Sequence, residues 1–113
     1  MTLKLVQDKP FSRMGKPQNT HIIGACILDK IVEIIETIIY SRRQIRIWIT
    51  EYTLHCIIVI NGVKGYGGVQ IALYDEQANV NFKGQDQEYS TSDPDFVEKL
   101  LGIVREWVYG IPS

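Results

Sequence analysis

The stretch "SRRQIRIWITEYTLHCIIVI", residues 41–60, marks the point at which the periodicity of the chain changes. Within it, Ile45, Ile47 and Ile49 alternate with polar or aromatic residues, which is the two-residue repeat of a half-buried β-strand. On a helix these three isoleucines would be spread around the cylinder. The run from Cys56 to Ile60 is apolar at every position, which predicts a central strand covered on both faces.

The link between these two runs contains no glycine, proline, asparagine or aspartate, the residues that often mark a turn. Two interpretations follow. Either residues 51–53 form a tight hairpin, or residues 43–60 form one long strand that bends at a bulge. We adopt the hairpin.

Residues 41–52 of the same stretch, "SRRQIRIWITEY", resemble the start of the DNA-reading helix of homeodomains. The resemblance implies a helix that reads bases in the major groove. However, Glu51 stands where that family has its adenine-reading asparagine, and DNA phosphates would repel its carboxylate. Tyr52 and Thr53 stand where the family has an arginine pair. These departures, together with the two-residue repeat, exclude a homeodomain.

The segment that precedes this stretch predicts a helix. Asp29, Glu33 and Glu36 recur at spacings of three and four residues, which places them on one solvated stripe. Isoleucines fill much of the remaining circumference, and Thr20 can cap the first turn. The alternative is a strand over residues 21–28, followed by a shorter helix that Asp29 caps.

Residues 1–20 are expected to form a separate N-terminal segment. Leucines alternate with lysine over residues 3–5, which is compatible with a short strand. Lys9, Arg13 and Lys16 then lie among prolines and glycine, a composition typical of an exposed basic arm or loop.

The segment that follows residue 60 predicts further strands. Asn61 and Gly62 open the glycine-rich run "NGVKGYGG", and this pair is a strong hairpin signal because both residues tolerate positive φ. Residues 69–75 then alternate as a strand, residues 76–79 are expected to turn, and residues 80–84 return as another strand. The polar residues 85–92 are predicted to form a loop.

The last segment predicts a helix. Asp93 can cap it with Pro94 at the first helical position, or Ser92 and Asp95 can form a capping box. Gly110 is expected to end it. One apolar stripe runs along this helix, formed by Phe96, Val97, Leu100, Leu101, Val104, Trp107 and Val108.

The 113 residues therefore predict one domain of the α+β class over residues 21–113. Its elements are a helix, an antiparallel sheet of about four strands and a closing helix. Both helices are expected to pack on one face of the sheet.

Composition excludes several classes of protein. Twelve basic and thirteen acidic residues give a net charge of −1, so no overall field attracts nucleic acid or an anionic membrane. Charged residues interrupt the longest apolar stretch, which excludes a membrane span there. Two cysteines without motif spacing indicate reduced thiols and a cytoplasmic protein.

Motifs for catalysis, metal binding and cofactors are not recognisable in the sequence. His21, His55, Cys26 and Cys56 are the only soft metal ligands, and they lack the paired spacing of a zinc site. We therefore expect no metal, no cofactor and no enzymatic activity.

The first helix carries apolar residues around more than half of its circumference, more than one sheet face should bury. Such an excess often marks an interface, and homodimerisation commonly satisfies it. We therefore expect a small binding or regulatory protein of the inhibitor, immunity or adaptor type. It would act through a protein–protein surface as a homodimer. The expected interface residues are Ile27, Ile31, Ile34, Ile35 and Ile38.

An alternative is a protein that binds a small phosphate-bearing ligand such as a nucleotide. Arginines would neutralise the phosphate, an aromatic ring would stack on a base, and the glycine-rich loop would close over the ligand. Nucleic-acid binding by the basic N-terminal arm is a weaker alternative. The expected ligand-binding residues are Arg42, Arg43, Arg46, Trp48, Lys64, Gly65, Tyr66, Gly67 and Gly68.

Overall fold

The computed structural model describes residues 2–8, 19–38, 44–61 and 65–111, with side chains described for residues 20–36, 45–61 and 65–111. Within these ranges the elements are β1 (Thr2–Asp8), α1 (Asn19–Ile38), β2 (Gln44–Glu51), β3 (Cys56–Asn61), β4 (Val69–Leu73), β5 (Gln77–Phe82), β6 (Gln85–Ser90) and α2 (Phe96–Tyr109).

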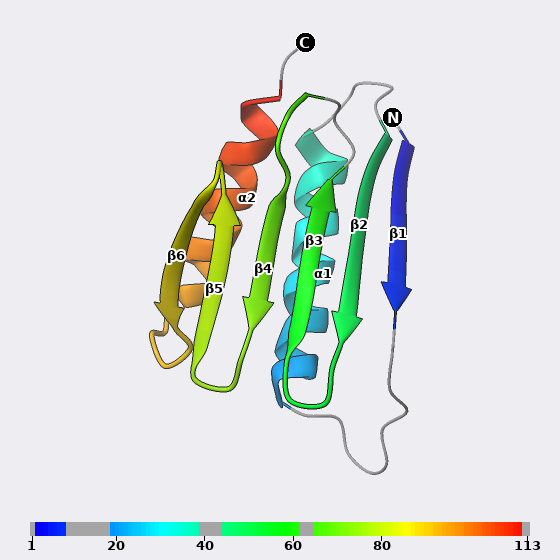
Figure 1. Cartoon of the computed structure of the whole chain (residues 1–113). Coiled ribbons are helices and arrows are strands. Elements are labelled where there is room, and N and C mark those ends of the chain that lie inside the picture. Colours follow the sequence, from blue (N-terminus) through cyan, green and yellow to red (C-terminus); the bar gives the residue numbers. More distant parts are fainter. Residues whose placement is uncertain (1, 9–18, 39–43, 62–64, 112–113) are drawn as a thin grey trace.

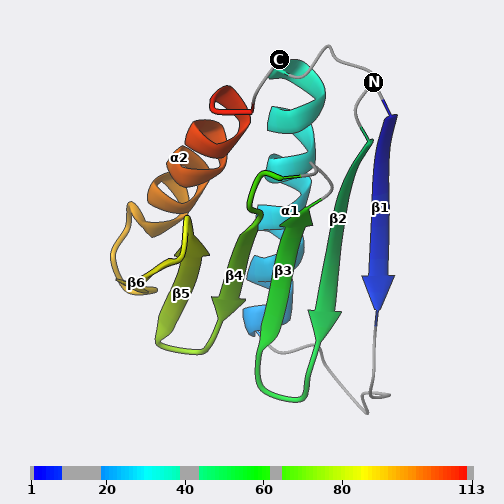
Figure 2. The same ribbon diagram turned by 45° about the horizontal axis from the view of Figure 1, so that its top comes forward.

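The strands of the described ranges form one six-stranded sheet in the order β1-β2-β3-β4-β5-β6. Strands β2 to β6 form an antiparallel meander, and β1 pairs in parallel with β2 at one edge. Both helices cover the same face of this sheet (Figures 1 and 2). The predicted α+β architecture is confirmed. The sheet is larger than the four strands expected, because β1 and β6 extend it.

The core lies between the sheet and the two helices. Alternate residues of β2 point into it, and Ile45, Ile47 and Ile49 are buried as the two-residue repeat predicts. In β3, burial also alternates, so Ile57 and Val59 are only half buried. The prediction that this run is covered on both faces is therefore wrong, since the helices cover one face only.

The β2–β3 connection is a hairpin, as adopted from the sequence. Tyr52 and His55 flank its two-residue turn, and the Tyr52 N–H donates to the His55 carbonyl oxygen at 2.8 Å. The turn itself consists of Thr53 and Leu54, so it overlaps the predicted residues 51–53 only at Thr53, and Glu51 still belongs to β2.

Two predictions for the C-terminal half of the sheet are wrong. Residues 85–90, predicted as a loop, form the edge strand β6. The two-residue turn before it consists of Lys83 and Gly84, both at positive φ (55° and 75°), as a type I′ hairpin requires. The turn expected at residues 76–79 lies earlier, where the Tyr74 N–H donates to the Gln77 carbonyl oxygen at 2.8 Å.

Helix α1 includes residues 21–28, so the strand alternative for that segment is wrong. Gly24 has a packing role there, because a Cβ at this position would lie 2.6 Å from Cys56 Sγ on β3. A glycine therefore lets α1 approach the sheet closely.

Helix α2 begins at Phe96, slightly later than a cap at Asp93 would place it. Asp93 organises the turn before the helix: its Oδ1 accepts from the Asp95 N–H at 2.9 Å, and its carbonyl oxygen accepts from the Phe96 N–H. The helix ends at Gly110, as predicted. Six of the seven residues in the predicted apolar stripe are buried, and Val97 is half buried.

Within the described ranges, neither helix combines the length and the apolar character needed to cross a membrane.

Candidate interaction surface

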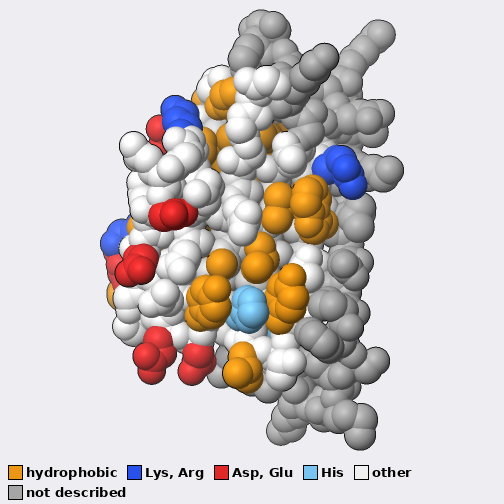
Figure 3. All heavy atoms as spheres, viewed as in Figure 1, with side chains coloured by type: hydrophobic (Ala, Val, Ile, Leu, Met, Phe, Trp, Pro, Cys, Tyr) orange, Lys and Arg blue, Asp and Glu red, His pale blue; other side chains and the backbone are white. Residues whose placement is uncertain are grey.

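The face of the sheet opposite the helices is not covered by any described element (Figures 1 and 2). Outward positions on β2, β3 and β4, with the residues flanking their turns, are mainly apolar or aromatic. Figure 3 shows these side chains gathered over the three strands. We call this group the open-face patch, and it consists of Trp48, Tyr52, His55, Ile57, Val59, Ala72 and Tyr74.

Three rings of the patch form a continuous stack at one end of the face. Tyr52 and His55 lie with centroids 4.7 Å apart and planes 11° from parallel. His55 and Tyr74 lie 5.0 Å apart with planes at 17°. The stack joins β2, β3 and β4 across their outer surface, and Tyr74 is 39% exposed. It presents a rigid aromatic edge to solvent.

At the other end of the patch, Trp48 lies opposite Val59 in the β2–β3 register. The guanidinium of Arg46 lies 5.4 Å from the centroid of the Trp48 ring, a cation–π contact. A shallow hollow of about 210 Å³ opens next to Val59, with Asn61 and Gly68 among its lining residues.

Gly68 cannot carry a side chain in this position, because a Cβ would lie 2.2 Å from the carbonyl oxygen of Ile60. Gly65 requires glycine for a different reason, its φ of +76°. Gly67 is exposed, and its carbonyl oxygen accepts a hydrogen bond from the Trp107 indole. Gly65 and Gly68 thus meet backbone requirements of the β3–β4 connection, and Gly67 contributes a main-chain acceptor.

Tyr66 is directed toward α2. Its hydroxyl donates to the Trp107 carbonyl oxygen at 2.9 Å, and the two rings lie 5.8 Å apart. Burial, and secondarily the carboxylate of Glu106, raises the pKa of the Tyr66 hydroxyl. Of the expected ligand-binding residues, Arg46 and Trp48 are brought together, while Tyr66 lies against the helix. Arg42, Arg43 and Lys64 lie outside the described residues.

The expected interface on α1 divides into two parts. Ile27, Ile31 and Ile35 are at most 1% exposed and face the sheet, so they belong to the core of the folded chain. Ile34 is half buried and lines a groove between α1 and α2. The side chain of Ile38 lies outside the described ones.

That interhelical groove has a volume of about 470 Å³. Its lining combines apolar side chains with charges of both signs. The residues are Lys30, Glu33 and Ile34 on α1, and Glu98, Leu101, Arg105 and Tyr109 on α2.

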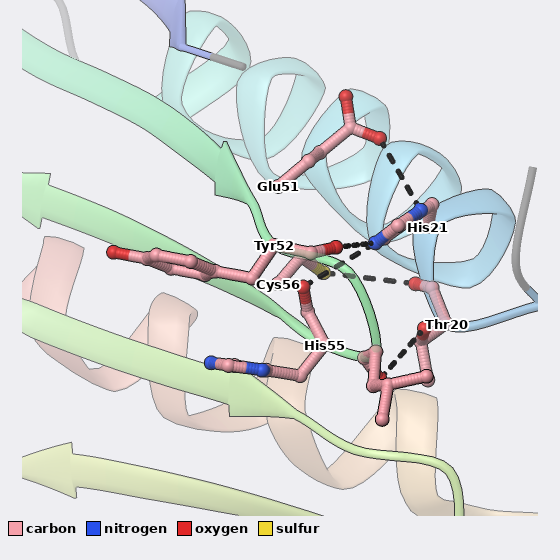
Figure 4. Close-up of polar contacts among 7 residues, drawn as sticks. Thr20, His21, Glu51, Tyr52, His55 and Cys56 are labelled. Atoms are coloured by element: carbon pink, nitrogen blue, oxygen red, sulfur yellow. Dashed lines mark hydrogen bonds and ion pairs between the residues drawn. The ribbon is translucent and has the colours of Figure 1, made fainter. Parts of the chain in front are cut away.

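A buried polar cluster joins the start of α1 to the β2–β3 turn (Figure 4). His21 is 3% exposed, and its Nε2 lies 2.6 Å from the Tyr52 carbonyl oxygen and 3.3 Å from that of His55. Its Nδ1 lies 3.8 Å from a carboxylate oxygen of Glu51. The cluster therefore anchors the hairpin turn to the helix.

Cys56 adjoins this cluster, and its thiol donates to the Thr20 carbonyl oxygen at 3.6 Å. Burial, and secondarily the charge of Glu51, raises the pKa of the Cys56 thiol to about 12. A thiol in this environment stays protonated at neutral pH and is a poor nucleophile. The contacts of His21, Glu51 and Cys56 thus join the start of α1 to the β2–β3 hairpin.

Among the residues whose side chains are described, no three His, Cys, Asp or Glu residues form a group that could hold a metal ion. The basic residues Lys9, Arg13 and Lys16 of the N-terminal arm lie outside the described residues.

Sequence reasoning missed most of the open-face patch. The sequence of residues 56–60 is apolar at every position, so no alternation in residue type indicates the alternating burial that leaves Ile57 and Val59 half buried. The patch was missed because the run from Cys56 to Ile60 was predicted to be covered on both faces, although both helices were expected on one face of the sheet.

Comparisons with protein-family models, with curated proteins and with solved structures give no match to this chain.

Proposed function

We propose that this chain is a small non-enzymatic binding or regulatory protein that acts on a protein partner through the open-face patch. The observation that supports this proposal is the composition of an uncovered sheet face. An antiparallel sheet with one solvated face normally carries polar residues there. Over β2 to β4 this face instead presents aliphatic residues together with two tyrosines and a tryptophan, and tyrosine and tryptophan are enriched at interface centres.

The non-enzymatic part of the proposal is supported by the state of the most reactive grouping in the described chain. Cys56 lies in the core with a raised thiol pKa, and His21 is engaged with backbone carbonyl groups. An inhibitor, immunity protein or adaptor needs a surface of this kind and no reactive group.

We further propose that the protein is a homodimer in the cytoplasm and that two copies meet at the interhelical groove. In a two-fold contact, residue i of one copy meets residue j of the other, and the reverse. The groove carries Lys30 and Arg105 with Glu33 and Glu98, a balanced set that complements its own copy. The two cysteines are unpaired in the structure, which is compatible with a reducing compartment.

A matched pair of photo-crosslinking variants tests both surfaces. Tyr74 is 39% exposed on the open face, and Tyr109 is 73% exposed beside the groove. Each tyrosine is replaced, in the full chain, by a benzophenone amino acid of similar shape. Each variant is expressed and crosslinked in the cells from which the protein comes. We expect Tyr74 to give an adduct with a different protein, competed by excess unmodified chain but not by Trp48→Ala. We expect Tyr109 to give a species of twice the chain mass.

The two results are independent. If the Tyr74 variant gives no adduct that the unmodified chain competes, the open-face patch does not bind a protein. If the Tyr109 variant stays monomeric on denaturing gels and the chain has a monomer mass by native mass spectrometry, the homodimer is wrong.

A second candidate function is the binding of a small phosphate-bearing ligand at the other end of the same face. The observation that favours it is the Arg46–Trp48 contact, one strand away from the hollow at Asn61 and Gly68. The guanidinium would pair with a phosphate and the indole with a base. Titration with ATP and with inorganic phosphate tests this candidate, because Arg46→Ala would abolish the binding of both. Absence of saturable binding to the unmodified chain contradicts it.

A further inference from the structure

The two sides of the open face carry different charges. Asp86 and Glu88 occupy outward positions of β6, and Asp75 and Glu76 form the turn between β4 and β5. Among the outward side chains described on β2 to β6, Arg46 is the one cation. Figure 3 shows acidic side chains on the left of this face, beside the apolar group. We call these four carboxylates the acidic flank.

Arg46 is too far away to neutralise the acidic flank. It lies on β2, and β6 is the fourth strand beyond β2 in the sheet. Four spacings of about 4.8 Å place the two strands about 19 Å apart. Exposed charges at that separation are largely screened, because the Debye length is about 8 Å at physiological salt. The β5–β6 turn adds one cation, Lys83, whose Nζ lies 5.1 Å from the ring centroid of Phe82, a residue that packs against the core. Four carboxylates against this one cation leave the flank with a net negative potential.

A hollow of about 500 Å³ lies where the acidic flank meets the aromatic stack. It is lined by the exposed Tyr74, by the carboxylates of Asp75 and Glu76, and by the amides of Gln77 and Asn79. Carboxylate and amide oxygens accept hydrogen bonds from ammonium and guanidinium groups, and a tyrosine ring attracts such cations. The chemistry of this hollow suits the end of a lysine or arginine side chain.

We propose that the occupant of the open face is a basic segment of a protein partner. Its apolar side chains cover the open-face patch over β2 to β4, and its lysine or arginine side chains lie against the acidic flank over β5 and β6. This inference rests on the proposed function and adds the chemistry of the partner. The patch provides contact area, and the flank provides charge complementarity, which mainly sets specificity and association rate.

A second copy of the chain is a poorer occupant of this face. Its own open face would bring the same four carboxylates against two cations, Arg46 and Lys83, so most charges in the contact would have like sign. The phosphates of a nucleic acid would be repelled by the flank for the same reason.

Two synthetic peptides test the inference with the full, isotope-labelled chain. One has an apolar half of leucine and phenylalanine and a basic half of lysines, and its twin has glutamate at each lysine position. Binding is followed by amide chemical-shift changes, which also locate the contact. We expect the lysine peptide to bind at least about tenfold more tightly at low salt, a difference of about 1.4 kcal/mol. The shifts should fall on β3, β4 and β6, and added salt should reduce the preference.

Charge-neutralised variants assign that preference to the acidic flank. Asp86→Asn with Glu88→Gln should reduce the lysine preference several-fold. In the native chain the Asn81 amide donates to Asp86 Oδ1 at 2.8 Å. The Asp86→Asn side chain keeps an amide oxygen that can accept this hydrogen bond. The matched control, Asp29→Asn with Glu36→Gln, removes the same charge from exposed positions of α1. The control should keep the preference.

The outcomes separate the two proposals. If both peptides shift the same amides with equal affinity, the open face binds proteins but the basic partner is wrong. If the lysine preference survives in the Asp86/Glu88 variant or disappears in the control, the acidic flank is not its cause and the inference is wrong. If neither peptide shifts the open face, the inference is wrong, and the Tyr74 crosslink alone then decides the proposed function.

Discussion

The Tyr66 hydroxyl donates a hydrogen bond to the carbonyl oxygen of Trp107, while the Trp107 indole N–H donates back to the carbonyl oxygen of Gly67. This reciprocal pair attaches the β3–β4 connection to the last turns of α2. Gly110 completes the contact, because a Cβ there would lie 2.5 Å from the Tyr66 hydroxyl. Within the glycine-rich run that suggested a phosphate-binding loop, Tyr66 and Gly67 thus belong to a contact between a connection and a helix.

Replacing Tyr66 with Phe should lower the free energy of unfolding by about 0.5–1.5 kcal/mol, the usual loss for one hydrogen bond. Chemical denaturation monitored by tryptophan fluorescence measures this change. The control is Tyr109→Phe, since Tyr109 is 73% exposed and its hydroxyl should contribute little. Equal effects of the two substitutions would show that the Tyr66–Trp107 bond does not stabilise the fold.

The close approach of α1 to the sheet predicts strong coupling between Gly24 and Cys56. Gly24→Ala should destabilise the protein by about 1–3 kcal/mol, because the added Cβ overlaps Cys56 Sγ. Cys56→Ala makes room, so the double variant should be more stable than the sum of the single effects implies. The matched control is Gly102→Ala on α2, where a Cβ meets nothing within 4 Å. It should stabilise the protein by roughly 0.5–1 kcal/mol. Additive effects of Gly24→Ala and Cys56→Ala would contradict the overlap.

The elements that the sequence predicted correctly have a local cause. The apolar stripe of α2 and the alternation of Ile45, Ile47 and Ile49 each follow from the geometry of one segment. Strand β6 has no such signal, because nearly all its side chains are exposed. It forms by main-chain pairing with β5 across a turn in which Lys83 takes the left-handed conformation that Asn or Gly more often adopts.

The β2–β3 turn and the open-face patch required tertiary information. Thr53 and Leu54 are not residues that typically form turns. The hydroxyl of Thr20 on α1 donates to the Leu54 carbonyl oxygen, and the imidazole of His21 contacts the carbonyl oxygens of Tyr52 and His55. The sequence expectation placed both helices on one face but predicted β3 to be covered on both, because residues 56–60 are apolar at every position. Local periodicity distinguishes the two faces of a strand but not which of them a distant helix covers.

The two cysteines should differ sharply in reactivity. Cys26 is exposed on α1, and Cys56 is 0% exposed with a thiol pKa of about 12. A thiol-specific reagent at pH 8 should therefore modify Cys26 rapidly and Cys56 only at the rate of unfolding. Peptide mapping of the modified chain identifies each site, and denaturant should release the second thiol. Rapid modification of Cys56 in the native protein would contradict its burial.

The raised pKa of Cys56 also predicts a loss of stability at alkaline pH. Folding favours the protonated thiol, so its contribution is complete below the ordinary pKa of 9.0 and is lost as the pH rises toward about 12. Denaturation midpoints should fall more steeply between pH 8.5 and 10.5 for the native chain than for Cys56→Ala. Cys26→Ala is the control and should keep the native slope. Parallel slopes for all three proteins would show that the thiol does not titrate differently on folding.

At acidic pH, the turn before α2 should respond through Asp93. The Lys99 ammonium, which donates a hydrogen bond to the Asp93 carboxylate, lowers the pKa of Asp93 below its usual value of 3.8, and the Asp95 N–H adds to the effect. The stabilising contribution is therefore present above pH 3.8 and is lost as the pH falls through the lowered pKa.

Asp93→Asn keeps an oxygen for the Asp95 N–H but does not titrate, and Lys99→Met removes the main cause of the shift. Both variants should lose less stability than the native chain when the pH is lowered from 6 to 2, as measured by denaturation midpoints. Both side chains are solvent-accessible, so added salt should weaken the difference. A native chain whose acid response matches that of Lys99→Met would show that this ion pair does not stabilise the start of α2.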